Sequence, residues 1–195
     1  MQLFRVSFSG ELAFEVNVDS RYAAEMWRSI AGAGEDFGIT PYGTETMHVL
    51  RAEKGFVIVG QDTDGSVTPV DLGMNWLLSK NKDFLGKRSL SRPDSVRTDR
   101  KQLVGLSSED GVSVVPEGTQ LVDDPAAAIP VPMCGHVTSS YASACLERPI
   151  AMALVAGGHA RKDQTIYAAL LDGSFVPMKI TSPVFYDAKG ERQNV

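Results

Sequence analysis

Two charged residues could bind a ligand because each lies on an element that is otherwise largely apolar. Glu15 lies on the polar side of the alternating segment 12–18, and Arg51 follows Met47 by one turn of a predicted helix. A carboxylate accepts paired N–H bonds, and a guanidinium donates paired bonds to a carboxylate. Structural readings are also open. Glu15 could be solvated or paired across a hairpin with Arg5, and Arg51 could lie along an apolar surface beside Glu53.

Residues that commonly bind metals are present but poorly spaced for that purpose. Asp62 and Asp64 belong to a DTDG motif, with Asp71 downstream, but the motif lacks the remaining ligands of a calcium loop. The two cysteines have no CxxC partner and no neighbouring histidine, so a zinc site is not expected. His136, in GHVTSS, is interpreted as a structural residue. We therefore predict no metal site, and two reduced thiols, as is usual in the cytoplasm.

The sequence lacks the motifs of the common catalytic and nucleotide-binding sites. It has no GxGxxG opening a helix, no GxxxxGK[ST], no GxSxG and no HExxH. The chain itself is therefore not expected to hold a flavin or a nicotinamide. Any function must depend on a binding surface built from less distinctive residues.

Composition excludes several kinds of partner. The 195 residues carry a net charge of −5, and no Lys/Arg cluster stands out, so nucleic acid is not expected as a partner. Charged residues make up 22%, which is typical of a folded chain. No apolar run reaches the roughly 20 residues needed to cross a bilayer, and no signal peptide is visible. The start, MQLF, enters a strand pattern at once, and we expect the sequence to be a piece of a longer chain.

The first elements predicted are a β-hairpin and two helices. Strands over residues 3–8 and 12–18 would be joined by a three-residue turn, which pairs Phe4 with Val16 and places Arg5 opposite Glu15. This register keeps one face apolar, whereas a two-residue loop would pair Phe4 with Glu15. A helix capped by Asp19 and Ser20 follows, and a second is expected from about residue 43 to residue 54. Gly55 is predicted to end it.

The remaining elements change in character along the chain. Residues 56–59 form a continuous apolar run, which predicts a strand buried on both faces, and residues 83–90 look helical. Residues 72–79 could be strand or short helix, and residues 91–100 form the best linker. Six short β segments with turn residues between them then predict a small barrel or sandwich: 102–106, 118–122, 134–138, 150–155, 165–171 and 175–181. The fold class is therefore α+β, with one domain over 1–95 and an all-β domain over 96–195.

Several of these segments together resemble a known family. The segments that carry the resemblance are SFSGELAFEV, TPYGTETMHVLRAEKGFVIVGQDTDGSVTPVDLGMNW, FLGKRSL, RKQLVGL and GHVTSS. They are similar to the aminomethyltransferases, the folate-dependent T-proteins of the glycine cleavage system and their relatives. GTETMHVLRAEKG, RTDRKQLVGL, GHVTSSY and SPVFYD look most like the C-terminal end of the α subunit of heterotetrameric sarcosine oxidases.

The resemblance implies a fold and a function. Residues 1–95 would be a ferredoxin-like half of a T-protein-like folate-binding domain, and residues 96–195 its C-terminal β-barrel. Enzymes of this kind oxidise sarcosine to glycine, with hydrogen peroxide and 5,10-methylenetetrahydrofolate as further products. FAD, FMN and NAD would belong to the full complex and not to this chain. The partners implied are tetrahydrofolate, the other subunits and the rest of the α subunit.

The resemblance also assigns residues. Glu15 would bind the pterin edge of folate, Phe8 would stack where the family usually has Tyr, and Arg51 would bind the ligand too. Met47 stands where T-proteins carry a further arginine. The family's catalytic aspartate would lie upstream of residue 1, so no catalytic residue is expected in the chain. On its own we expect the chain to have no oxidase activity and to bind folate weakly or not at all.

Two alternative functions are also compatible with the sequence. Some relatives are non-catalytic folate-binding proteins that carry KGCYxGQE, and residues 54–62 keep that frame but lack its cysteine. The chain could instead be a module that only holds other subunits together.

Overall fold

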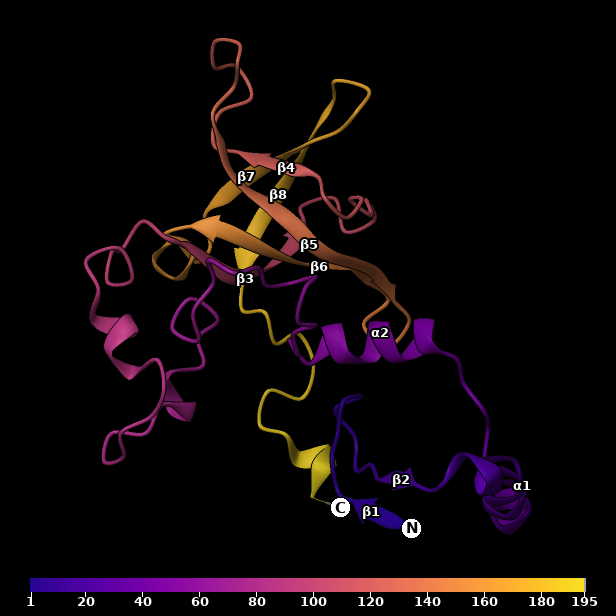
Figure 1. The fold of residues 1–195 in the computed structure, drawn as a ribbon. Coiled ribbons are helices and arrows are strands. Elements are labelled where there is room, and N and C mark those ends of the chain that lie inside the picture. The colour runs from indigo at the N-terminus through magenta and orange to yellow at the C-terminus, as the bar shows by residue number, and fades with distance from the viewer. Residues whose placement is uncertain (195) are drawn as a thin grey trace. The chain divides into compact units, whose positions relative to one another are not determined.

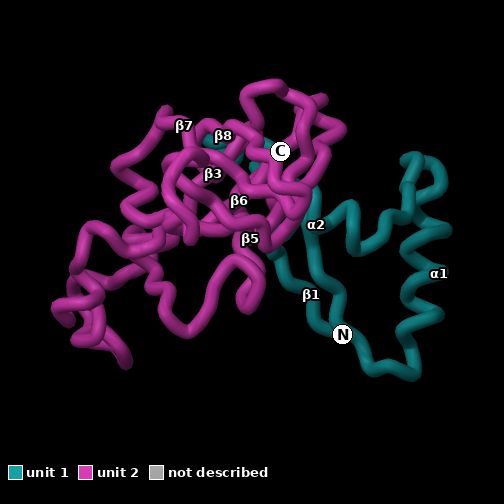
Figure 2. The backbone as a smooth tube through the Cα atoms, turned by 90° about the horizontal axis from the view of Figure 1, so that it is seen from above, with its two compact units in different colours: residues 1–51, 187–195 teal, residues 52–186 magenta. Residues whose placement is uncertain are grey.

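The computed structural model describes residues 1–194, and these divide into two compact units (Figure 2). Unit 1 comprises residues 1–51 and 187–195, and unit 2 comprises residues 52–186. No helix in the described part of the chain is long and apolar enough to cross a membrane. An α+β part followed by a β-barrel confirms the predicted fold class.

Unit 1 contains a two-stranded antiparallel sheet and helices (Figure 1). Its elements are β1 (Gln2–Phe4), β2 (Glu15–Asn17), the 3-10 turn η1 (Ser20–Tyr22), α1 (Ala23–Gly34), η2 (Glu35–Phe37), α2 (Thr44–Glu53, whose last two residues belong to unit 2) and η6 (Glu191–Gln193). Asp19 accepts a hydrogen bond from the Arg21 backbone N–H, as predicted for a helix cap. Helix α1 has no buried residue, and Trp27 on it is 63% exposed.

Unit 2 is organised around a closed six-stranded barrel in the order β3-β6-β5-β4-β7-β8. Its strands are β3 (Lys101–Ser108), β4 (Gln120–Val122), β5 (Met133–Ser143), β6 (Arg148–Ala156), β7 (Thr165–Ala169) and β8 (Phe175–Thr181). All pairs are antiparallel. Each predicted β segment coincides with a strand, so the predicted barrel is confirmed.

Two hydrophobic clusters explain why β6 is apolar at nearly every position. Ala151, Ala153 and Val155 point into the barrel core. The alternate residues belong to a second cluster: Ile150, Met152 and Leu154, with Ala52 and Leu103. Successive side chains of a strand point to opposite faces, so β6 is buried on both. The outer face is covered by partly buried residues that include Val57, Val67, Leu72 and Phe185.

The predicted strand over residues 56–59 is wrong. Residues 56–58 have no regular structure, and Val59 makes only an isolated bridge with Thr63. The backbone bonds of this stretch are local, because the N–H groups of Gln61 and Asp62 both donate to the Ile58 carbonyl. The apolar run instead packs on the barrel's outer cluster through Val57.

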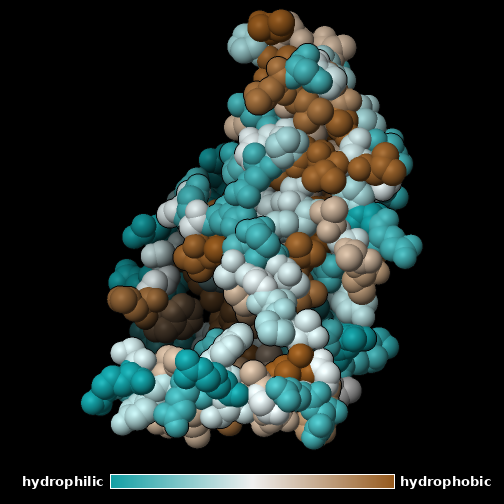
Figure 3. Space-filling model, turned by 90° about the vertical axis from the view of Figure 1, so that its right-hand side faces the viewer, coloured by the Kyte–Doolittle hydropathy of each residue, from teal (hydrophilic) through white to brown (hydrophobic). Residues whose placement is uncertain are grey.

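The segment between α2 and the barrel contains two short turns of 3-10 helix, η3 (Asn75–Leu77) and η4 (Lys87–Ser91). The helix expected over 83–90 is therefore reduced to η4. Another turn of 3-10 helix, η5 (Gly158–Arg161), follows β6. Figure 3 shows hydrophobic side chains (brown) at several places on the face that it draws. The exposed large hydrophobic residues of the described chain include Trp76 and Leu85.

Candidate functional site

Glu15 begins β2, and its side chain is exposed. It pairs with Phe4, while Leu3 pairs with Val16. This register is the one expected for a two-residue loop. The predicted register, in which Phe4 pairs with Val16 and Arg5 lies opposite Glu15, is therefore wrong. Among residues 1–194, the Glu15 carboxylate has no ion pair or hydrogen bond, which leaves both oxygens able to accept N–H bonds from a ligand.

The register differs because the strands are joined by a long connection and not by a tight turn. Residues 5–14 lie outside the two strands, and the tail of the chain holds them. The Leu12 N–H donates to the Arg192 carbonyl at 3.1 Å, and the Arg192 Nε donates to Glu11 at 2.6 Å. Arg5 donates to the Gln193 carbonyl at 2.7 Å. The conformation of residues 5–14 is therefore held by bonds to residues about 180 positions away in sequence. The rule that a short turn sets the register of a hairpin does not apply to such a connection.

Phe8 lies in this same connection and is half-buried. Phe8 and Glu15 thus come from one loop-and-strand region of unit 1. Arg51 lies near the end of α2, and its side chain is 0% exposed. Met47, one turn earlier, is half-buried. Of the three residues assigned to folate by resemblance, Glu15 is exposed, Phe8 is half-buried and Arg51 is buried.

The aspartates at positions 62, 64 and 71 do not form a common site. Asp64 accepts bonds from the backbone and hydroxyl of Ser66, and these bonds lower the pKa of its carboxyl. Asp71 accepts bonds from Thr68 and Arg100, with Arg100 Nη2 at 2.9 Å. Within the described residues no group of three or more His, Cys, Asp or Glu side chains could hold a metal ion.

Asp62 is the centre of a buried network that the sequence reasoning missed. One of its oxygens, Oδ1, accepts bonds from Thr138 Oγ1 at 2.6 Å and Ser139 Oγ at 2.7 Å. The other accepts from the Ile58 N–H at 2.9 Å. Neighbouring Gln61 donates from Nε2 to Glu117, 3.1 Å away, and to the Thr138 carbonyl. This network fixes the connector after α2 against β5. The pattern TSS inside a strand was the available signal, because adjacent hydroxyls in a buried strand need partners.

His136 lies in β5 and is half-buried, opposite Gln120 on β4 and Leu154 on β6. Burial lowers the pKa of its imidazole, and the positive charge of Lys101 adds to the effect. Cys134 is buried and Cys145 is exposed, and both thiols are free.

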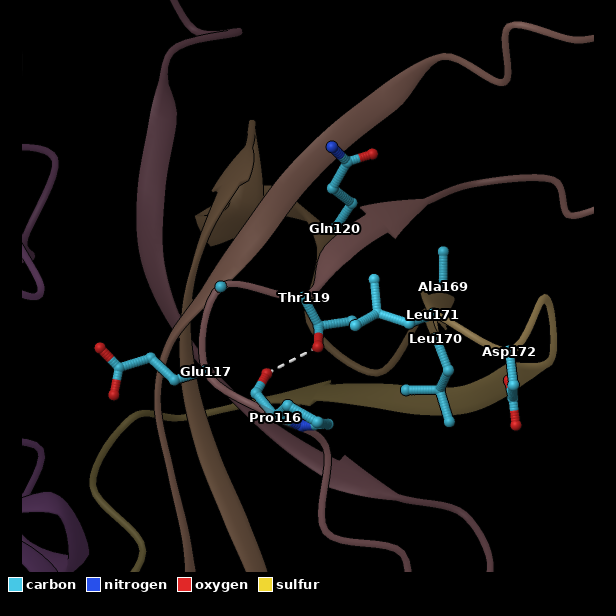
Figure 4. Close-up of a pocket in the computed structure, with 9 residues that line it drawn as sticks. Pro116, Glu117, Thr119, Gln120, Ala169, Leu170, Leu171 and Asp172 are labelled. Atoms are coloured by element: carbon cyan, nitrogen blue, oxygen red, sulfur yellow. Dashed lines mark hydrogen bonds between the residues drawn. The ribbon is translucent and has the colours of Figure 1, made fainter.

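A hollow of about 770 Å³ lies in unit 2, next to β4 and between two loops (Figure 4). It is lined by Pro116, Glu117, Gly118, Thr119, Gln120 and residues 169–172. Thr119 Oγ1 donates to the Pro116 carbonyl at 2.6 Å, and Glu117 points away from the other labelled side chains. The hollow is lined by no cysteine, histidine, lysine or arginine, and none of Glu15, Phe8 and Arg51 lines it.

Comparison with known proteins identifies the family. Residues 1–82 match the model of the GCVT N-terminal domain, and residues 101–187 match that of the glycine cleavage T-protein C-terminal barrel domain. The sarcosine oxidase subunit alpha of Corynebacterium sp. (strain P-1) is 48% identical over 195 residues, or 99% of this chain and 20% of that subunit. The corresponding subunit of Rhizobium meliloti (strain 1021) is 40% identical over the same span.

Aminomethyltransferases are more distant relatives. That of Streptomyces coelicolor is 32% identical over 186 residues, covering 93% of this chain and 48% of that enzyme. Among solved structures, glycine cleavage system aminomethyltransferase T from Bartonella henselae has a TM-score of 0.76 at 20% identity, over 95% of this chain and 50% of that one. The chain thus spans about a fifth of the sarcosine oxidase subunits and about half of the aminomethyltransferases. It belongs to the glycine cleavage T-protein family, within which it is similar over its whole length to the C-terminal region of sarcosine oxidase α subunits.

Proposed function

We propose that this chain is part of the α subunit of a cytoplasmic sarcosine oxidase and contributes to its tetrahydrofolate site. The observation that carries the proposal is the 48% identity to a sarcosine oxidase α subunit over the whole chain. In the proposed reaction, sarcosine is oxidised to an imine, and the imine carbon passes to tetrahydrofolate. Glycine, 5,10-methylenetetrahydrofolate and hydrogen peroxide are the products. The flavins that carry out the oxidation, and NAD, would be held elsewhere in the complex.

The role proposed for Glu15 is to bind the pterin ring. An aminopterin edge presents two parallel N–H donors, and a carboxylate with two free oxygens accepts both. The exposed position of Glu15 at the start of β2 fits this role without any rearrangement. A charged acceptor of this kind also orients the ring, because paired bonds define a plane.

Phe8 and Arg51 complete the proposed contribution. Phe8 supplies an aromatic face for stacking, without the hydroxyl of a tyrosine. Arg51 supplies positive charge for an anionic part of folate. Because its side chain is 0% exposed, a direct bond to the ligand requires α2 to shift, whereas Glu15 needs no such change. No catalytic role is proposed for any residue of the chain, and by itself it is expected to have no oxidase activity and to bind folate weakly or not at all.

The test uses the protein as the cell makes it, purified with its companion subunits. We expect sarcosine-dependent hydrogen peroxide production, and 5,10-methylenetetrahydrofolate whenever tetrahydrofolate is supplied. A complex that oxidises sarcosine but releases only formaldehyde in the presence of tetrahydrofolate would contradict the folate role. A protein that purifies alone and does not oxidise sarcosine would contradict the enzyme assignment.

A further inference from the structure

The segment between η3 and the barrel is positively charged in a chain that is negative overall. Residues 80–101 contain eight basic and three acidic residues, whereas the whole chain carries a net charge of −5. The basic residues are spaced along the sequence and form no continuous run, so they do not stand out until the segment folds. In Figure 1 the segment forms the magenta and pink loops that lie outside the barrel.

The acidic residues of this segment are already engaged. Asp94 pairs with Arg97 and with Arg100, whose Nη1 lies 2.6 Å from Asp94 Oδ2. Asp99 pairs with Arg97 at 2.7 Å. Asp83 accepts the backbone N–H of Phe84 at 3.1 Å. Within residues 1–194, Arg88 and Arg92 have no ion pair, so their charges are not neutralised by the protein.

These two arginines line one hollow. A hollow of about 440 Å³ is lined by Arg88, Ser91 and Arg92. The Ser91 hydroxyl donates to the Arg88 carbonyl at 2.9 Å, so it fixes the turn and leaves ligand contacts to the guanidiniums. Pro93 follows Arg92 and favours the extended backbone (φ −65°, ψ 148°) that ends η4 at this point.

A third basic residue of η4, Lys87, is held by backbone carbonyls. The ammonium of Lys87 donates to the Lys82 carbonyl at 2.8 Å and to the Lys80 carbonyl at 3.4 Å. These bonds hold the backbone of residues 80–82 to a side chain of η4. Two unneutralised guanidiniums that share a hollow repel each other, and an anion between them removes that repulsion.

We propose that Arg88 and Arg92 form a binding site for a multiply charged anion bearing phosphate or carboxylate groups. A guanidinium binds either group through two parallel N–H···O bonds, so the chemistry favours oxyanions over chloride. The site lies wholly within unit 2. It is independent of Glu15, and its existence does not depend on the proposed oxidase activity.

The test is calorimetric titration of the full chain with inorganic pyrophosphate and, separately, with citrate. Measurements are made at about 0.15 M salt, where exposed charges more than about 8 Å apart are largely screened. We expect saturable binding of at least one anion, weakened at least tenfold in the R88Q/R92Q variant. The R97Q variant removes a paired arginine of the same segment and is the matched control, with an expected change of less than twofold. Pyrophosphate and citrate together distinguish a phosphate site from a carboxylate site.

Three results would overturn the proposal. The first is the absence of saturation by either anion up to about 10 mM, well above the dissociation constant of a millimolar site. The second is unchanged binding in R88Q/R92Q. The third is equal weakening in R97Q and R88Q/R92Q, which would indicate general attraction to a basic surface. Because Arg88 and Arg92 are exposed, both variants are expected to fold, and matching urea unfolding curves would verify this.

Discussion

Asp62 accepts a hydrogen bond of 2.7 Å from the hydroxyl of Ser139, which lies 77 residues further along the chain. Thr138 donates to the same carboxylate at 2.6 Å, and Asp62 is 0% exposed. The carboxylate thus accepts bonds from two side-chain hydroxyls and from the Ile58 N–H, as buried polar groups require. This arrangement explains how a connector without regular structure is held on the barrel.

Replacing Asp62 with Ala is therefore expected to destabilise the protein strongly. The substitution removes the buried acceptor of the Ser139 hydroxyl and of the Ile58 N–H, whereas the Thr138 hydroxyl keeps the Met152 carbonyl, 3.2 Å away, as an acceptor. We expect a loss of about 3 kcal/mol in the free energy of unfolding, measured by urea denaturation. The matched control is Asp64→Ala. That carboxylate bonds only to its near neighbours, so its loss is expected to cost less than about 1 kcal/mol. Equal losses in the two variants would contradict the prediction.

Gly55 ends α2 with φ +68°, a conformation that favours glycine. A Cβ atom added there would lie 2.6 Å from the Pro183 carbonyl oxygen, which is backbone and cannot turn aside. Gly55→Ala is thus expected to cost more than about 2 kcal/mol of unfolding free energy, since backbone strain and a clash add. Gly111 has a similar φ of +72° but nothing within 4 Å, so Gly111→Ala measures the strain alone, about 1 kcal/mol. Similar costs at the two sites would show that the clash relaxes.

The comparison of residues 56–59 with β6 shows how far the sequence could predict this fold. Both stretches are continuous apolar runs, yet only β6 has strands on both sides to complete its backbone bonds. Local hydrophobicity identifies burial, but not whether a partner strand is available. The six barrel strands were predictable because each run is bounded by turn residues and pairs with a similar run.

The candidate site was less predictable for the same physical reason. The register that places Glu15 opposite Phe4 depends on contacts with Arg192 and Gln193 at the far end of the chain. The partners of Asp62 lie 76 and 77 residues away. No periodicity within a short window carries such information. The assignment of Glu15, Phe8 and Arg51 came from family resemblance and stays a prediction.

The ionisation of Asp71 makes the free energy of unfolding depend on pH in the acid range. Burial alone would raise the pKa of its carboxyl, but bonds from Arg100 and Thr68 outweigh burial and hold it below its ordinary value of 3.8. A pKa that is lower in the folded state means that the folded state favours the charged form. The resulting stabilisation is complete above pH 3.8 and is lost as the pH falls from there through the folded pKa. We therefore expect Asp71→Asn to lower stability at pH 7 and to flatten the loss of stability below pH 4.

Urea denaturation at a series of pH values measures this effect, and Arg100→Gln is the companion variant. Arg100 is 12% exposed on its side chain and bonds both carboxylate oxygens, so its loss should remove most of the same pH dependence. In the double variant the two losses should not add, because they report one interaction. Full additivity would show that the two residues stabilise the fold independently.

The two thiols are expected to differ sharply in reactivity. Cys145 is exposed, whereas Cys134 is 7% exposed, and burial together with the charge of Asp123 raises the pKa of its thiol. Since the thiolate is the reactive form, Ellman's reagent should modify one thiol rapidly and the second only after unfolding. Cys145→Ser should abolish the rapid phase, and Cys134→Ser should leave it intact. Two rapid equivalents in the native protein would contradict the burial of Cys134.

Glu15→Gln provides the sharpest test of the proposed folate role. The amide keeps the size of the side chain but replaces one acceptor oxygen with a donor, so one of two charge-assisted bonds to the pterin edge becomes a repulsion. In the native complex we expect tetrahydrofolate to bind about tenfold to a hundredfold more weakly, as measured by calorimetry, from the loss of about 1.4 to 3 kcal/mol. Sarcosine-dependent peroxide production should be unchanged, because the proposed function assigns the flavin chemistry to other parts of the complex. Glu25→Gln, an exposed carboxylate on α1, is the matched control and should bind tetrahydrofolate like the wild type. Unchanged folate affinity in Glu15→Gln would remove Glu15 from the site while leaving the family membership intact.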